Sequence, residues 1–80
     1  MMKMVLEAEI PENIAELLAK NNAVEWAQEF LGANLECAVE DWWPRDADRL
    51  GVTGESARES IDVLAVHFED AAAVPHAAAS

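Results

Sequence analysis

A shortage of bulky apolar side chains limits what this chain can fold into. Its 80 residues include three tryptophans and two phenylalanines, and many of the other apolar residues are alanines, which bury little area each. A chain of this length buries roughly 60% of the surface that its unfolded form exposes. We therefore expect one small domain of modest stability, which a homodimer or a bound partner would stabilise further.

Helix signals recur along the first half of the sequence. Pro11 suits the first turn of a helix, and Asn22, followed three residues later by a glutamate, has the pattern of a capping box. Pro44 ends a helical stretch, because the residue before a proline avoids the α region. The segment 23–43 is either one kinked helix or two helices separated near Gly32. Its expected apolar face consists of Trp26, Ala27, Phe30 and Leu31.

The second half predicts two further helices. Residues 46–50 form a short helical turn that Gly51 ends, and Thr53 or Ser56 caps a last helix that runs to about Ala72. This last helix carries an apolar stripe, as expected of a helix that packs on a core. The stripe consists of Ala57, Ile61, Leu64, Ala65 and Phe68.

These signals predict an all-α fold: a compact domain of three to four helices over residues 1–72. Residues 4–10 alternate with a period of two, which indicates a short N-terminal arm or strand. No second segment offers a pairing strand, and an isolated strand is unstable. Residues 73–80, rich in alanine and containing Pro75, are predicted to be a disordered tail.

The charge is strongly one-sided. Sixteen acidic residues face five basic ones, which gives a formal net charge of −11. Such a field repels nucleic acid and anionic membranes and attracts basic protein surfaces. It also keeps a small protein in solution without any further role. The charge therefore predicts a basic partner protein, with no direct contact to nucleic acid or membrane, or else only solubility.

Signals for catalysis, metals and export are absent from the sequence. Cys37 is the only cysteine, and we expect a buried, reduced thiol. His67 and His76 have no metal-ligand spacing with it, and there is no phosphate-binding loop or nucleophile motif. No apolar run approaches the ~18 residues of a membrane span, and no signal peptide begins the chain. We expect a cytoplasmic protein that is not an enzyme and holds no cofactor or metal.

The predicted last helix suggests an acidic partner-binding surface. On a helical wheel, Glu55, Glu59, Asp62 and Glu69 fall within a sector about 80° wide, with Val66 at its centre. Carboxylates four residues apart repel one another by a few tenths of a kcal/mol. The helix tolerates this repulsion, so the sector is either a docking face for a basic partner or a solvated face.

Two adjacent tryptophans, Trp42 and Trp43, form the second candidate surface. Neighbouring helical residues point about 100° apart, so both indoles do not fit into one small core. We expect one in the core and the other in a contact surface, within a homodimer or with a partner, because tryptophan is enriched among binding hot spots.

Residues 46–64 resemble the helix-turn-helix pattern. The resemblance rests on Ala47 four residues before Gly51, on Val52 in the turn, and on Ala57 and Ile61 as inward positions of a second helix. The resemblance implies a DNA-binding regulator. However, the family's base-reading positions fall on Thr53, Glu55, Ser56 and Glu59, which are largely acidic and would repel phosphate.

In size, charge and helical content the chain also resembles the small acidic inhibitors, including anti-CRISPR proteins and other DNA mimics, that phages and mobile elements use against host defence. This resemblance implies a non-enzymatic inhibitor or adaptor that docks an acidic helical surface on a basic, nucleic-acid-handling protein. One alternative is a transcriptional or antitoxin-type regulator that keeps the helix-turn-helix scaffold. Another is an acidic adaptor whose contact is the tryptophan pair alone.

Overall fold

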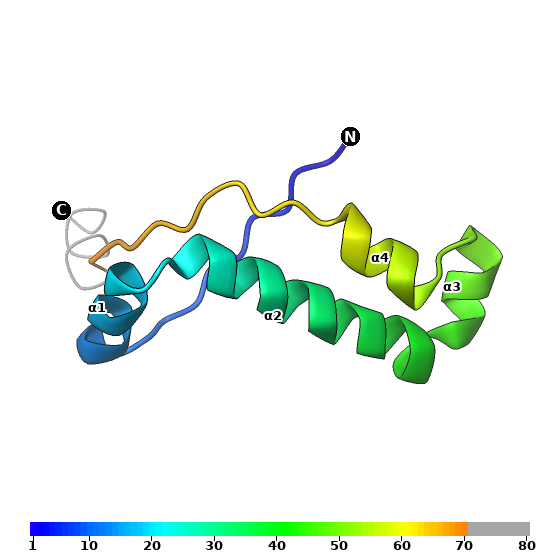
Figure 1. The fold of residues 1–80 in the computed structure, drawn as a ribbon, viewed down its shortest axis with the longest axis horizontal. Helices are drawn as coiled ribbons and strands as arrows, with labels where there is room; N and C mark the ends of the chain where they lie inside the picture. Colours follow the sequence, from blue (N-terminus) through cyan, green and yellow to red (C-terminus); the bar gives the residue numbers. More distant parts are fainter. Residues whose placement is uncertain (71–80) are drawn as a thin grey trace, which may run out of the picture. The chain divides into compact units, whose positions relative to one another are not determined.

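The computed structural model describes residues 1–70, which are all-α as the sequence predicts (Figure 1). The helices are α1 (Glu12–Lys20), α2 (Ala23–Cys37), the π-helical turn η1 (Ala38–Trp42), α3 (Pro44–Leu50) and α4 (Gly54–Ser60). Residues 1–10 have no regular secondary structure, so the N-terminal segment is an arm and not a strand.

The contacts of the chain divide it into two units. One consists of Met1–Asn21 together with the segment from His67 onward, and the other is Asn22–Val66. The single domain expected over residues 1–72 stays a prediction. The tail expected at 73–80 lies outside the described residues.

Helix α1 begins directly after Pro11, as the sequence predicts, and its C-terminal cap is Asn21. The carbonyl of Pro11 accepts hydrogen bonds from the N–H groups of Ile14 and Ala15, at 3.1 and 3.0 Å. At the other end, the side-chain amide of Asn21 donates to the carbonyl of Leu17 at 2.8 Å. No residue of α1 is fully buried, and only Ala15 and Leu18 are partly buried, so the hydrogen bonds at its two ends contribute much of its definition.

Helix α2 and η1 form one continuous helical stretch. Asn22 caps it with a left-handed backbone (φ 41°) and a side chain that accepts the N–H of Glu25 at 3.2 Å. The stretch passes through Gly32 without a break. Its last turn widens, and the N–H of Trp43 donates to the carbonyl of Ala38, five residues back, at 2.8 Å. The choice between one helix and two is thus decided in favour of one.

The connections around α3 follow the predicted signals. Pro44 is the first residue of α3, two residues before the expected start, and Gly51 ends the helix with a left-handed backbone (φ 70°) that glycine adopts without strain. Thr53 caps α4 through a capping box. Its hydroxyl accepts the N–H of Ser56 at 3.1 Å, and the Ser56 hydroxyl accepts the N–H of Thr53 at 2.9 Å.

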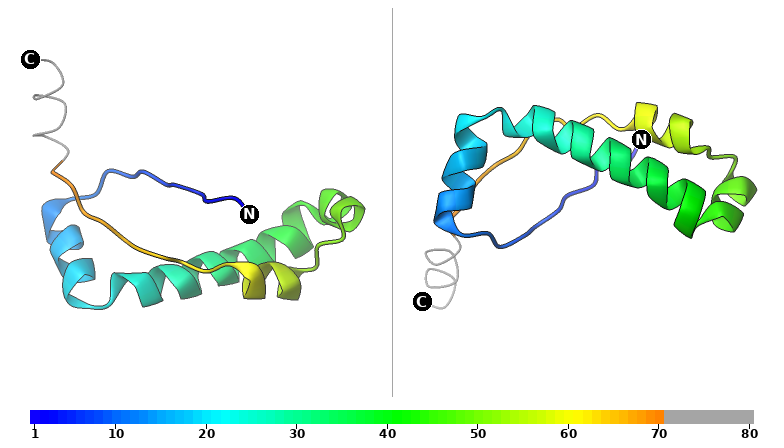
Figure 2. Two further views of the ribbon diagram at one scale, coloured as in Figure 1. Left: turned by 90° about the horizontal axis from the view of Figure 1, so that it is seen from above. Right: turned by 60° about the horizontal axis from the view of Figure 1, so that its bottom comes forward.

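The core of the 22–66 unit is built from small side chains. Val39, Ala47 and Ala57 are buried together, and Leu35 packs against them. Helix α4 lies alongside α2 in all views (Figures 1 and 2). Gly32 of α2 permits this approach, because a Cβ there would lie 3.1 Å from the Cγ of Arg58. Both Ala47 and Ala57 are inward positions, as the helix-turn-helix pattern implies.

Helix α4 ends at Ser60, so the prediction of a helix to about Ala72 is wrong from residue 61 to residue 70. Ile61 is extended (φ −81°, ψ 134°), and residues 61–70 have no regular secondary structure. Because the helix ends at Ser60, the residues of the predicted apolar stripe do not share one helix face. Ala57 is buried, but Leu64 is 72% exposed. Residues 71 and 72 lie outside the described part.

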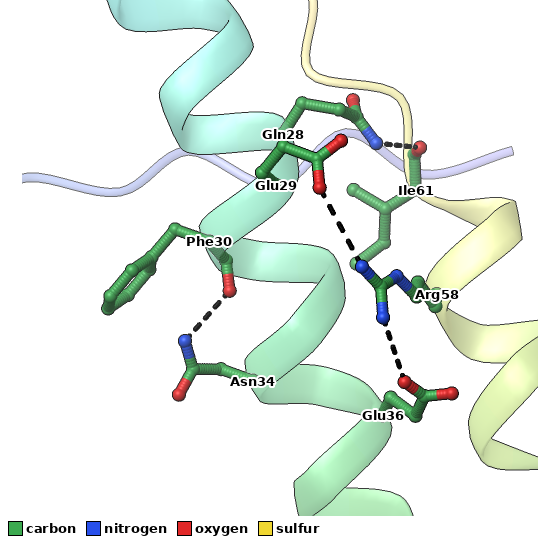
Figure 3. A network of polar contacts seen from close by, with 7 residues as sticks. All are labelled: Gln28, Glu29, Phe30, Asn34, Glu36, Arg58 and Ile61. Carbon is green, nitrogen blue, oxygen red and sulfur yellow. Dashed lines mark hydrogen bonds and ion pairs between the residues drawn. The ribbon is translucent and has the colours of Figure 1, made fainter.

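A side chain of α2 explains why the backbone leaves the helix. The amide of Gln28 donates to the carbonyl of Ile61 at 2.8 Å and accepts the N–H of Val63 at 2.7 Å (Figure 3 shows the first bond). Gln28 thus satisfies the backbone of the extended segment as a neighbouring strand would. Ile61 and Val63 are half-buried and Asp62 is exposed, as alternation along an extended chain requires.

Candidate protein-binding surface

Trp42 and Trp43 lie where η1 ends and α3 begins. Their rings meet edge to face, with centroids 6.2 Å apart and planes at 78°. Trp42 is 70% exposed and Trp43 is 50% exposed. The expectation that one indole lies in the core is therefore wrong, because the small side chains of Val39 and Ala47 fill that space.

Two shallow hollows flank Trp43. The first is mainly apolar, has a volume of about 270 Å³, and is lined by Val39, Trp43, Asp46, Ala47, Leu50 and Val52. The second is lined by Asp41, Trp42, Trp43, Pro44, Arg45 and Asp46. We call the exposed apolar side chains Trp42, Trp43, Leu50 and Val52 the tryptophan surface. Leu50 is 71% exposed and protrudes from this surface, next to the apolar hollow that it helps to line.

The rim of the tryptophan surface carries both signs of charge. Asp46 pairs with Arg49 at 3.4 Å, and Asp41 accepts a hydrogen bond from the thiol of Cys37. Arg45 has no ion-pair partner among residues 1–70, so its guanidinium remains available for an outside group.

The structure does not gather the predicted acidic sector on one helix. Glu55 and Glu59 lie four residues apart on α4 and are exposed. Asp62 is exposed and Val66 half-buried, both in the extended segment, and Glu69 belongs to the other unit. The helical sector is wrong because α4 ends at Ser60. Roles of these five residues in partner binding stay predictions.

The carboxylates of α2 have a structural role that those of α4 lack. Arg58 pairs with Glu36 at 3.0 Å and with Glu29 at 3.6 Å, which ties α4 to α2 (Figure 3). Pairs this exposed contribute about 0–1 kcal/mol each. Within residues 1–70, no basic side chain pairs with Glu55 or Glu59. The acidic face of α4, meaning these two residues, is therefore not neutralised by any ion pair within the described residues.

Cys37 is exposed, so the prediction of a buried thiol is wrong. It lies on the side of α2 away from the small core, and its Sγ donates to Oδ2 of Asp41 at 3.3 Å. This hydrogen bond raises the pKa of the thiol, with smaller contributions from desolvation and from the charges of Asp41, Glu40 and Glu36. A protonated thiol is a poor nucleophile, so this shift lowers the reactivity of Cys37 at neutral pH.

Replacing Asp41 with alanine should therefore make Cys37 more reactive. Without the hydrogen bond and charge of Asp41, the pKa of Cys37 falls toward its ordinary value and the thiolate fraction at a given pH rises. Iodoacetamide alkylation, followed by mass spectrometry between pH 7 and 10, should show the rate profile of the variant displaced to lower pH. An unchanged profile would contradict the assigned hydrogen bond.

Three structural features of the 22–66 unit were not predicted from the sequence. Nothing in the sequence singles out Gln28, whose role depends on a segment 33 residues away. The sequence did offer a sign of the role of Arg58, because it is the only lysine or arginine after Arg49 in a strongly acidic chain. Trp26 and Phe30 were expected to face the core, but they are 51% and 52% exposed, because α2 presents Gly32 and Leu35 to its neighbours.

The described residues offer no preformed metal centre: within 1–70, no three His, Cys, Asp or Glu side chains are placed to hold an ion. No helix in that part of the chain has the length and apolar character needed to cross a membrane. Comparison with known protein families, characterised proteins and solved structures finds no match to this chain.

Proposed function

We propose that this protein is a non-enzymatic inhibitor or adaptor that acts in the cytoplasm by binding a partner protein. The observation that carries this proposal is that the buried core contains small side chains, whereas large aromatic side chains lie on the surface. The core of the 22–66 unit consists of Val39 and alanines, while the indoles of Trp42 and Trp43 are exposed. Exposed apolar patches on small proteins mark interaction sites.

The charge of the chain supports a basic partner. A net charge of −11 and the unneutralised Glu55 and Glu59 favour approach of a surface rich in lysine and arginine. Proteins that handle nucleic acids present such surfaces. The proposed mode is that of a DNA mimic or anti-CRISPR-type inhibitor: carboxylates steer the encounter, and the tryptophan surface holds the complex.

Affinity capture from the native host tests the proposal. The immobilised protein should retain a basic, nucleic-acid-handling protein at low salt and release much of it at high salt, because exposed charge pairs are screened within about 10 Å at 0.1 M salt. Capture that does not respond to salt would favour an adaptor that uses the tryptophan pair alone. Capture of only acidic or neutral proteins would contradict the proposal.

The double variant E55K/E59K tests the acidic face of α4. It should slow association with the captured partner by about tenfold or more at low salt and flatten the dependence of the rate on ionic strength. Both residues are exposed, so the fold should persist. The control is E7K/E9K, which makes the same change of net charge at two exposed residues of the N-terminal arm that have no ion-pair partner within residues 1–70. Equal slowing by both variants would assign the effect to net charge.

A helix-turn-helix regulator is a second candidate, because α3, the turn at Gly51 and α4 occur in that order with Ala47 and Ala57 buried. Two observations weigh against it. Helices α3 and α4 each pack on η1 instead of on each other, and the exposed face of α4 carries Glu55 and Glu59. Retardation of duplex DNA in a gel at physiological salt would favour the regulator over the inhibitor.

A further inference from the structure

The exposed side of α2 carries an apolar stripe that the proposed function does not use. Its residues, which we call the α2 stripe, are Trp26, Phe30, Ala33 and Cys37. All four are exposed, and the rings of Trp26 and Phe30 stack with centroids 5.2 Å apart. Figure 3 shows Phe30 on the side of α2 away from Arg58 and Glu36, so the stripe lies opposite the face that packs on α4.

The spacing of the α2 stripe is that of a helix-pairing seam. Steps of four, three and four residues match the d and a positions of a heptad repeat, where apolar side chains meet a second helix. No charged residue lies in the stripe, although a fifth of the chain is acidic. The flanking Glu29 and Glu36 are paired with Arg58, which reduces their repulsion of a like-charged helix.

We infer that the α2 stripe pairs with the α2 stripe of a second copy of this chain, in an antiparallel arrangement. The stripe is bulky at its N-terminal half and small at its C-terminal half. Antiparallel pairing about a two-fold axis between Leu31 and Gly32 places Trp26 against the second copy's Cys37, and Phe30 against its Ala33. Parallel pairing would instead stack Trp26 on Trp26 and leave a gap between the alanines.

The surface area that two paired α2 stripes would bury predicts a weak dimer. Aromatic side chains bury 150–250 Å² each when fully covered, so the half-exposed Trp26 and Phe30 of two copies together lose roughly 400 Å². This is well below the ~1,200 Å² of a standard stable interface. The dimer should therefore form at high protein concentration and tighten as salt screens the repulsion between two chains of charge −11. Binding to a basic partner has the opposite salt dependence.

Sedimentation equilibrium of the full chain tests the pairing. We expect a concentration-dependent dimer that A33D weakens at least about tenfold, because it places a charge in the seam. The matched control A19D introduces the same charge at an exposed site on α1 and should leave association unchanged. F30A removes a ring without adding charge and should also weaken the dimer. A monomer at all concentrations, or a dimer that is insensitive to both stripe variants, would overturn the inference.

A short bis-maleimide reagent, applied at alkaline pH, tests the orientation. In the antiparallel pair the two Cys37 thiols lie about 16 Å apart along the helix axes, whereas thiols introduced by A33C lie about 4.5 Å apart. We therefore expect A33C/C37A to give a covalent dimer and the wild-type chain to give none. Bridging of wild-type Cys37 would show parallel pairing and overturn the inference. Neither result bears on capture of a basic partner, so the two proposals fail separately.

Discussion

Replacing Ala57 with aspartate is expected to unfold the 22–66 unit. Ala57 is 5% exposed and belongs to the buried cluster that also contains Val39 and Ala47. A carboxylate buried there without a partner costs several kcal/mol. A domain of this size has a total stability on the order of 5 kcal/mol, so the substitution removes most of it. Circular dichroism should show loss of helical signal, and the thermal transition should disappear or fall steeply.

Two further variants make this result specific. A19D introduces the same charge on the exposed surface of α1 and should change the melting temperature little. A57L keeps the site apolar but overfills it, which costs about 1–3 kcal/mol and should lower the melting temperature without abolishing the fold. A wild-type melt for A57D would mean that Ala57 does not lie in the small core as described.

The local ends of the helices could be predicted from the sequence because their causes are local. Pro11, Asn22 and Gly51 each act through their own backbone and the next turn of chain, and each helix end is found where its signal lies. The fold class follows from these signals together. The inward positions Ala47 and Ala57 also follow from spacing alone.

What the sequence did not reveal depends on contacts between distant segments. The periodic pattern of residues 56–70 suits a helix, but Gln28 binds the backbone of Ile61 and Val63 and holds it extended. The predicted acidic sector assumed a helix through these residues, so its members do not share one helix face in the structure. The orientation of α2 differs from the expected one for a related reason. Large side chains usually face the core, but here Gly32 and Arg58 set the approach of α4.

Replacing Trp42 or Trp43 with alanine is expected to separate binding from stability. Each indole is at least half exposed, so each variant should fold and melt within a few degrees of the wild-type chain. Truncation of a central aromatic anchor typically costs 2–4 kcal/mol of binding, which is a loss of about 30- to 1,000-fold in affinity. Of the two, Trp43 lines both hollows, so its removal should have the larger effect on affinity.

The affinity of each variant for the captured partner is best measured by biolayer interferometry at physiological salt. W26A is the matched control: Trp26 is exposed to the same degree as Trp43 but lies on the α2 stripe. It should retain partner affinity and lose self-association. If W42A and W43A bind as tightly as the wild-type chain, the tryptophan surface is not the docking site. If both lose helical structure and W26A does not, the indoles stabilise the junction of η1 and α3 instead.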